Sequence, residues 1–327
     1  MFDIRGSSVV VTGGAGTIGS HIVEALVEEG ASKVVVLDNF SEGKLDNLAK
    51  ALSQRATTIE VVSTDIRNQE DLDVHFNGVD YVFHQASVLL LESMRKPQQA
   101  IDVNIQGTFN VFQSCTYVKH GVKKIVWASS ASVFGEPLRL PVDEDHPFNN
   151  VTFYGATKVA CEQFAASFHH QYGLKQVGLR YYNVYGPRQG IKGAYAQILP
   201  KWFDRIDAGL PIVIFADGSQ SMDLTFVRDI ARANVLALKS GVSNDFFNIG
   251  SGVETTVKQL AETVLEVSGF GLPPIYEPHD VNLVKRRQCS TVKAEKLIGF
   301  KSQVSVRQGV REYFEWRTSR TLTTVAR

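Results

Sequence analysis

The chain has little of what marks several large classes of protein. Its 327 residues include only three cysteines, Cys115, Cys161 and Cys289, which are odd in number and far apart. This pattern excludes a disulfide framework and fits no metal-ligand spacing, so we expect no bound metal and a reducing, cytoplasmic compartment. No apolar run approaches the roughly 20 residues of a membrane span. The first residues also lack the charged and apolar regions of a signal peptide.

A net charge is missing as well. Lysine plus arginine number 34, and aspartate plus glutamate also number 34. Without a global field, the chain has no general attraction for nucleic acid or for a membrane surface. An anionic ligand must therefore be held by local groups, and the partner that we expect is a small molecule.

What the sequence does have is an alternation of strand-length apolar runs with helix-length amphipathic segments. Strands that are apolar throughout are buried on both faces, so the alternation predicts an α/β fold with a Rossmann-type, doubly wound parallel sheet. The predicted strands are Ser8–Val11, Lys33–Leu37, Thr58–Ser63, Asp80–Gln85, Lys124–Ala128 and Gln176–Tyr181. The predicted helices are Gly19–Glu29, Leu45–Leu52, Gln69–Phe76, Ala100–His120 and Tyr154–Tyr172.

A glycine motif lies between the first strand and the first helix. Gly13 permits a tight turn, Gly16 lets the backbone approach a pyrophosphate, and Gly19 lets the helix pack close with its first amides aimed at phosphate. Asp38 ends the second strand about 20 residues later, where a carboxylate bonds a ribose 2′-hydroxyl and repels a 2′-phosphate. This predicts NAD rather than NADP, although Asp38 can also be a turn residue before Asn39.

A proton-transfer group follows in the second half of the chain. If Tyr154 lies on a helix, Lys158 is one turn further along the same face. An ammonium group close to a phenol favours the phenolate, which makes Tyr154 a usable general base. Tyr-x-x-x-Lys alone occurs on many helices by chance. Together with the glycine motif and with Ser130, it indicates reversible oxidation of an alcohol beside a dinucleotide.

These residues resemble the extended short-chain dehydrogenase/reductase superfamily, specifically its NAD-dependent nucleotide-sugar epimerases and dehydratases, and most closely the UDP-hexose 4-epimerases. The resemblance runs from about Val9 to Phe300, and its motifs lie at His84–Ala86, Asn104–Thr108, Ser129–Gly135, Tyr154–Lys158, Arg180–Pro187, Phe247–Gly250 and Lys293–Ala294. It implies that Lys158 also bonds the nicotinamide ribose, Ser130 the reacting hydroxyl, and Asn183 the substrate phosphates. The motif alignment selects Ser130 over its neighbours Ser129 and Ser132.

The predicted cofactor site also includes residues at the ends of the strands. Asp65 and Ile66 end the third strand and are placed to edge the adenine, although a plain helix cap before Asn68 is nearly as good an interpretation. The remaining predicted cofactor contacts are Thr17, Ile18, Asn39, Gln85, Ala86 and Asn104.

The segment after Ser130 decides the chemistry within this superfamily. Dehydratases carry an acidic pair there, because eliminating water needs an extra acid and base, and the sugar-acid decarboxylases carry a glutamate. This chain has Ala131 and Ser132. The resemblance then implies an epimerase that inverts C4 of a UDP-linked hexose or hexuronic acid through a transient 4-keto intermediate.

Two positions depart from the pattern of nucleotide-sugar enzymes. Met222 and Asp280 stand where the family usually carries arginines that hold the diphosphate. Loss of both costs charge-assisted bonds worth roughly 1.5–3 kcal/mol apiece. Arg188 and the basic run Lys285–Arg287 are candidate replacements, although the run can equally be a solvated face. Arg287 also falls near the position that gates room beside the sugar, which favours a small or anionic substituent. The predicted substrate contacts are Ser130, Asn183, Arg188, Arg286 and Arg287.

The departures keep other functions open. A dehydrogenase that releases NADH and acts on a smaller or non-nucleotide sugar, or on its phosphate, is the second hypothesis. A dehydratase or decarboxylase is a further alternative within the family. A redox-sensing binding protein on the same fold is disfavoured, because a sensor needs no activated phenol.

The length predicts two lobes, since single cores rarely exceed about 250–300 residues. We assign residues 1–183 and 224–250 to the NAD-binding domain, 184–223 and 251–320 to a smaller C-terminal α/β substrate lobe, and 321–327 to a polar tail. The resemblance also implies a homodimer in which helices Ala100–His120 and Tyr154–Tyr172 form a four-helix bundle with their symmetry mates. Burial of their apolar residues within the monomer is the plain alternative. Those residues are Val103, Val111, Phe112, Val159, Phe164 and Phe168.

Overall fold

The computed structural model describes residues 2–189, 198–278 and 285–325. Its centre is a seven-stranded sheet in the order β11-β6-β5-β4-β1-β2-β3, in which every neighbouring pair is parallel. The doubly wound parallel sheet is therefore as predicted. The strands are β1 Ser8–Thr12, β2 Lys33–Asp38, β3 Thr58–Ser63, β4 Tyr81–His84, β5 Lys124–Ser130, β6 Gln176–Tyr181 and β11 Asp245–Ile249.

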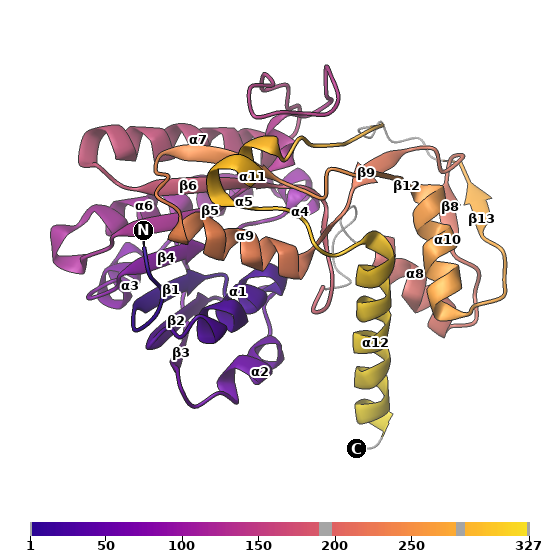
Figure 1. Cartoon of the computed structure of the whole chain (residues 1–327), viewed down its shortest axis with the longest axis horizontal. Coiled ribbons are helices and arrows are strands. Elements are labelled where there is room, and N and C mark those ends of the chain that lie inside the picture. The colour runs from indigo at the N-terminus through magenta and orange to yellow at the C-terminus, as the bar shows by residue number, and fades with distance from the viewer. Residues whose placement is uncertain (1, 190–197, 279–284, 326–327) are drawn as a thin grey trace.

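Helices cover both faces of the sheet (Figure 1). Successive residues of a strand point to opposite faces, so Val9 and Val11 pack in one apolar core while Val10 packs in the other. The first core is closed by α1 (Thr17–Glu28) and α9 (Val227–Lys239), which lie side by side. The second is closed by α3 (Gln69–His75), α6 (Thr108–Thr116) and α7 (Phe153–Tyr172). This burial on both faces explains the continuous apolar strands.

The predicted helix Ala100–His120 is not one helix. It consists of α5 (Pro97–Ala100), a π-helical segment Ile101–Gly107, α6, and a 3-10 turn Val118–His120. Gly107 packs on the Ile66 side chain, and a Cβ at Gly107 would lie 2.6 Å from its Cδ1 atom. The helix α4 (Leu90–Arg95) was not predicted. The predicted helix Leu45–Leu52 is a 3-10 turn Leu45–Leu48 followed by α2 (Ala49–Leu52).

A third apolar core lies at the other end of the molecule (Figure 1). It is formed by α8 (Ile198–Asp207), α10 (Val257–Ser268) and α12 (Val306–Val325), with short strand pairs beside them. The helix α12 continues into the segment that we predicted as a tail. The pairs are β7 Val184–Tyr185 with β10 Thr225–Phe226, β8 Val213–Phe215 with β13 Ile275–Glu277, and β9 Ser221–Asp223 with β12 Glu254–Thr256.

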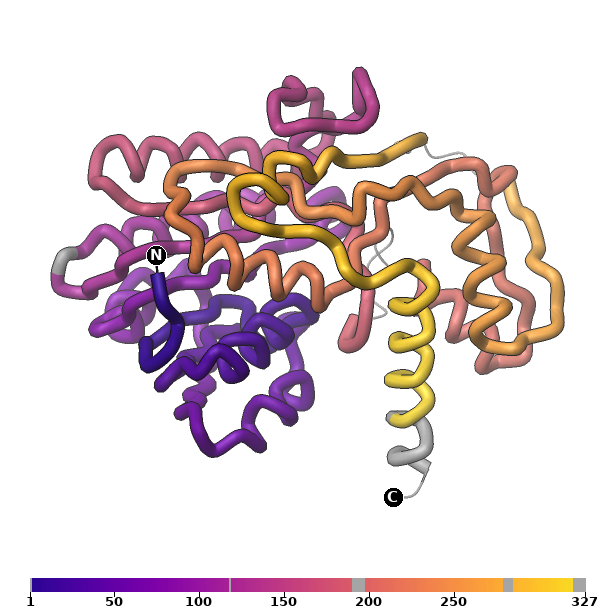
Figure 2. The backbone as a smooth tube through the Cα atoms, viewed as in Figure 1, coloured from indigo at the N-terminus to yellow at the C-terminus, as the bar shows by residue number. Residues whose placement is uncertain are grey.

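The chain passes between the two ends more than once (Figure 2). After β12 and α10 it returns to the sheet as α11 (Val292–Ile298), where Ala294, Ile298 and Phe300 join the core around α1 and α9. It then leaves again as α12. The domain boundaries remain a prediction. Among the described helices, none is long and apolar enough to cross a membrane.

Candidate active site

The glycine loop between β1 and α1 has the close approaches that its sequence implies. Gly13 has a positive φ of 65°, and a Cβ there would lie 2.7 Å from the Ala86 backbone nitrogen. A Cβ at Gly19 would lie 2.2 Å from the Gly13 carbonyl oxygen. Among the described residues, no side chain caps α1 at Gly16, where its first amides, including those of Thr17 and Ile18, begin the helix. This arrangement fits a pyrophosphate at the helix N-terminus.

Asp38 links the loop to the end of β2. Its Oδ2 atom accepts a hydrogen bond of 2.9 Å from the Ala15 backbone N–H, and its Oδ1 atom accepts one of 2.8 Å from that of Phe40. Burial raises the pKa of this carboxyl group. Asn47, which sequence reasoning missed, holds the same loop by donating to the Ala15 carbonyl at 2.8 Å. Asp38 is thus both a turn residue and an acceptor with lone pairs left for a ribose.

Asp65 and Ile66 lie just after β3, which ends at Ser63, and they have different surroundings. The Asp65 carboxylate accepts hydrogen bonds from Arg67 and, at 3.0 Å, from the Asn39 side-chain amide. The bonds from Arg67 lower the pKa of Asp65 to about 2, so the carboxylate stays charged. Ile66 is buried against Gly107. The helix cap is Asn68, whose side chain accepts from the Asp71 N–H.

Asn104 lies within the π-helical segment and has its side-chain amide fully engaged. Its Oδ1 atom accepts from the Val88 N–H at 2.7 Å, and its Nδ2 atom donates to the Val88 carbonyl and the Thr157 hydroxyl at 3.0 and 3.1 Å. The loop after β4, which begins with Gln85 and Ala86, is thereby fastened to α7. A local π-helix is often found at functional sites. Asn104 therefore positions the loop through backbone bonds.

The three predicted catalytic residues meet where β5 ends and α7 begins. Thr152 caps α7 by accepting from the Gly155 N–H at 3.0 Å, which places Tyr154 in the first turn. The Lys158 Nζ atom lies 5.6 Å from the centre of the Tyr154 ring and donates to the Ala128 carbonyl at 2.9 Å. Ser130 follows two residues after Ala128. A phenol, an adjacent cation and a hydroxyl are thus placed near one strand end.

Sequence reasoning missed an ion pair directly behind this group. Glu162 lies one more turn along the face of α7 that carries Lys158, and it is buried. It accepts from the Ser129 hydroxyl at 2.6 Å. Arg180 of β6 donates to both of its carboxylate oxygens, at 2.9 and 2.8 Å. The i, i+4 spacing from Lys158, and an arginine within a predicted buried strand, are the signals that point to it.

The predicted substrate residues do not converge on one point. Asn183 follows β6 with a positive φ of 26° and donates to the Asp223 carbonyl at 3.1 Å. Arg188 pairs with Glu24 of α1, and its carbonyl accepts from the Thr17 hydroxyl at 2.9 Å. Within the described residues, the Arg188 Nη1 atom is buried without a partner. Arg188 therefore lies beside the glycine loop.

The basic run divides between two surroundings. Arg286 is exposed and pairs with Glu254 of β12, and its hydrogen bonds lower the pKa of Glu254 to about 2. Arg287 is partly buried on the other side. Met222 lies opposite Thr255 in the β9–β12 pair and packs against the third core, that of α8, α10 and α12. Asp280 lies outside the described residues.

Comparison with known proteins agrees with this geometry. The sequence model described as the NAD dependent epimerase/dehydratase family matches residues 9–250. The chain belongs to this family. The predicted resemblance is therefore confirmed, and the choice of NAD as cofactor is confirmed at the level of the family.

Individual relatives show which reactions are found among proteins similar to this chain. It is 37% identical to a protein named as a putative UDP-glucose 4-epimerase from Methanocaldococcus jannaschii, over 94% of this chain and 97% of the relative. A UDP-N-acetylglucosamine 4-epimerase from Methanobrevibacter ruminantium M1, solved with UDP-N-acetylmuramic acid, is 33% identical with a TM-score of 0.90, covering 97% and 99% of the two chains. A UDP-N-acetyl-α-D-glucosaminuronate decarboxylase from Bacillus cytotoxicus is 29% identical over 94% and 96%. The relatives are thus nucleotide-sugar enzymes of more than one reaction type.

The position of Asp38 gives a testable cofactor preference. We expect NAD(H) to bind about ten- to a hundredfold more tightly than NADP(H), because a charged acceptor at the ribose repels a 2′-phosphate. Asp38→Asn should narrow this preference because it removes the negative charge, although its single side-chain oxygen can accept from only one of the Ala15 and Phe40 amides. Titration of both reduced cofactors by fluorescence measures it. Equal or tighter binding of NADPH to the unaltered protein would contradict the role of Asp38.

Proposed function

We propose that the chain is a nucleotide-sugar 4-epimerase, which inverts C4 of a UDP-linked hexose or hexuronic acid through a transient 4-keto sugar. The observation that carries this proposal is the meeting of Ser130, Tyr154 and Lys158 at the end of β5. The next two residues, Ala131 and Ser132, carry no carboxylate. Elimination of water or loss of CO₂ needs a further acid or base, so the residues present favour epimerisation.

The roles of the residues follow from their places. Tyr154 accepts the proton of the 4-hydroxyl group and later returns it, with Lys158 beside it to favour the phenolate. Ser130, on the neighbouring strand end, orients that hydroxyl by a hydrogen bond. NAD, when bound, supplies the group that takes up a hydride and gives it back. The glycine loop and Asp38 would hold it. Because the hydride returns to the sugar, the redox state is unchanged over a full cycle.

Product analysis tests the reaction. The protein is incubated with UDP-glucose, UDP-N-acetylglucosamine and UDP-glucuronic acid in turn, and the sugars are followed by NMR. The proposal expects a C4 epimer and no net NADH. A 4-keto-6-deoxy product would instead indicate a dehydratase, and loss of CO₂ a decarboxylase.

A dehydrogenase is the second candidate because of Met222. Its thioether packs against the third core and offers no charge to a diphosphate. Stoichiometric NADH release, or turnover only of smaller sugars and their phosphates, would favour this candidate over the epimerase.

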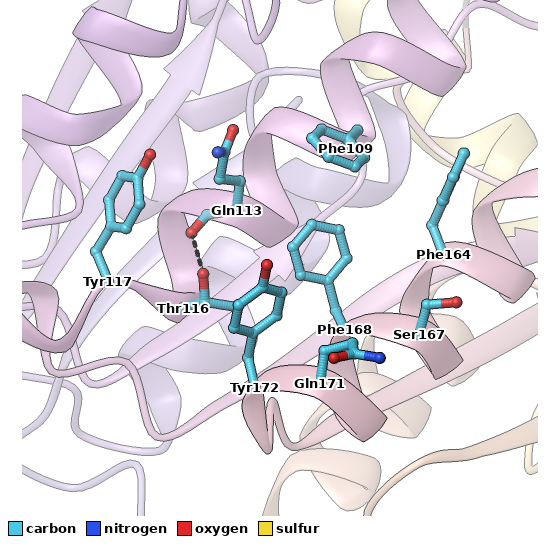
Figure 3. A pocket seen from close by; sticks show the side chains of 9 residues that line it. All are labelled: Phe109, Gln113, Thr116, Tyr117, Phe164, Ser167, Phe168, Gln171 and Tyr172. Atoms are coloured by element: carbon cyan, nitrogen blue, oxygen red, sulfur yellow. Dashed lines mark hydrogen bonds between the residues drawn. The ribbon is translucent and has the colours of Figure 1, made fainter.

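An apolar groove between α6 and α7 supports a homodimer (Figure 3). Two of the residues that we predicted for the dimer interface, Val111 and Phe112, are instead buried in the monomer, because they face the sheet. The groove beside them is lined by Phe109, Gln113, Thr116, Tyr117, Phe164, Ser167, Phe168, Gln171 and Tyr172.

We expect sedimentation at micromolar concentration to show a dimer that uses this groove. Phe109→Glu should shift the protein to a monomer, because a charge on this face cannot be paired when two apolar surfaces meet. Leu210→Glu, at an exposed apolar residue outside the groove, is the matched control and should leave the dimer intact. A strict monomer before any substitution would remove the prediction.

A further inference from the structure

The segment that carries the basic run alternates its side chains between two faces. Val142 donates its backbone N–H to the Gln288 carbonyl at 2.8 Å, and Ser290 donates to the Val142 carbonyl at 2.8 Å, so the chain here is extended. Successive residues of an extended chain point to opposite sides. Arg286 and Gln288 face β12 and the Gly252 carbonyl. Arg287 therefore shares the other face.

The face of Arg287 lies toward the reacting end of the site. Cys289 on this face packs in a small apolar cluster with Tyr182. The same cluster contains Ala131, Val133 and Phe134, which directly follow Ser130. A group held between Arg287 and this cluster is therefore close to the sugar end of a substrate whose hydroxyl meets Ser130.

Arg287 has no partner on this face. Among the described residues, no hydrogen bond or ion pair to its guanidinium group is formed, whereas the guanidinium of Arg180 is bound by Glu162. Burial lowers the pKa of Arg287, and the negative charge of Glu136 acts in the opposite direction. Glu136 itself is exposed and makes no hydrogen bond to it. The side chain of Arg287 is partly buried, so its guanidinium is open to a ligand anion with which it can form charge-assisted hydrogen bonds.

Tyr182 adds a second unpaired donor. Its side chain is 1% exposed, and its hydroxyl has no hydrogen-bond partner within the described part of the chain. A buried hydroxyl without a partner also costs free energy. A planar guanidinium and a phenol hydroxyl match the two oxygens of a carboxylate. Both orphaned groups would be satisfied by the same ligand group.

We propose that Arg287 and Tyr182 form a subsite for a carboxylate carried by the sugar of the substrate. The inference rests on the proposed function, because it takes the sugar to lie at Ser130. It narrows the substrate to a nucleotide sugar with an acidic substituent. A contact of Arg287 with the diphosphate is the competing source of negative charge, and the test separates the two.

The test uses the full chain with NAD and measures dissociation constants by calorimetry for UDP-glucuronic acid, UDP-glucose and UDP. We expect UDP-glucuronic acid to bind more tightly than UDP-glucose. Arg287→Met should weaken UDP-glucuronic acid binding by about ten- to a hundredfold, the value of a hydrogen-bonded charge pair, and leave UDP and UDP-glucose unchanged. Tyr182→Phe should weaken the same ligand by about tenfold. The melting temperature of ligand-free Arg287→Met should not fall.

Several outcomes would overturn the proposal. An equal loss for all three ligands places Arg287 at the diphosphate, and no loss for any removes it from the site. Failure of the unaltered protein to bind UDP-glucuronic acid would also overturn the proposal. Arg307→Met removes an equally charged side chain that pairs with Glu266 on the surface, and it should change no constant. If binding discriminates as expected but NMR shows no C4 inversion, the subsite stands and the proposed reaction fails.

Discussion

Replacing Tyr154 with phenylalanine is expected to reduce turnover by about 10²–10⁴-fold, the usual contribution of a positioned general base. The substitution removes only the phenol oxygen, so the ring stays beside the Lys158 ammonium, which lies 5.6 Å from its centre. NAD should still bind, because the glycine loop and Asp38 are unaltered. Single-turnover and steady-state rates with the best nucleotide sugar, together with a cofactor titration, give both quantities.

The control is Tyr276→Phe, which removes the hydroxyl of an exposed tyrosine in β13. It should leave the rate unchanged. Lys158→Ala should lower both the rate and the affinity for NAD, because Lys158 is expected to serve the phenol and the nicotinamide ribose. A Tyr154→Phe enzyme that retains more than about a tenth of the rate would contradict the role of the phenol as the base.

Much of the fold could be predicted because its rules are local. Strands β3 and β6 have the predicted bounds, because each is a run of strand length between turn residues, although only β6 is buried along its whole length. The interruption of the helix after Ala100 could not be predicted in this way. It depends on Gly107 meeting Ile66 and on Asn104 reaching Val88, and both contacts exist only once the sheet is formed.

The same distinction, between local rules and contacts that form only in the folded chain, applies to the residues of the site. Tyr154 and Lys158 are four residues apart on one helix, so their proximity follows from helical geometry. Arg286 and Arg287 look alike in the sequence, and only the partner of each tells them apart. That partner is Glu254 for Arg286, and within the described chain there is none for Arg287. Arg188 similarly lies beside α1 because of Glu24, far away in the sequence.

The second large effect that we expect is on folding, at the ion pair between Glu162 and Arg180. The side chains are 1% and 5% exposed, and the Arg180 guanidinium also lies 4.9 Å from the centre of the Phe134 ring. Among the described residues, Arg180→Leu leaves the buried carboxylate of Glu162 with only the Ser129 hydroxyl as a partner. Breaking a buried pair from one side costs about 3–5 kcal/mol, so the free energy of unfolding should fall by that amount.

Urea unfolding of NAD-free protein, followed by circular dichroism, measures this cost without the stabilisation that a bound cofactor adds. Arg228→Leu is the matched control, because Arg228 pairs with Glu312 while its own side chain is 54% exposed, and such surface pairs contribute about 0–1 kcal/mol. Adding Glu162→Leu to Arg180→Leu should recover much of the loss, since no unpaired charge then remains. A single variant as stable as the control would show that the Glu162 carboxylate is solvated, and its place behind Ser130 would then be open to water.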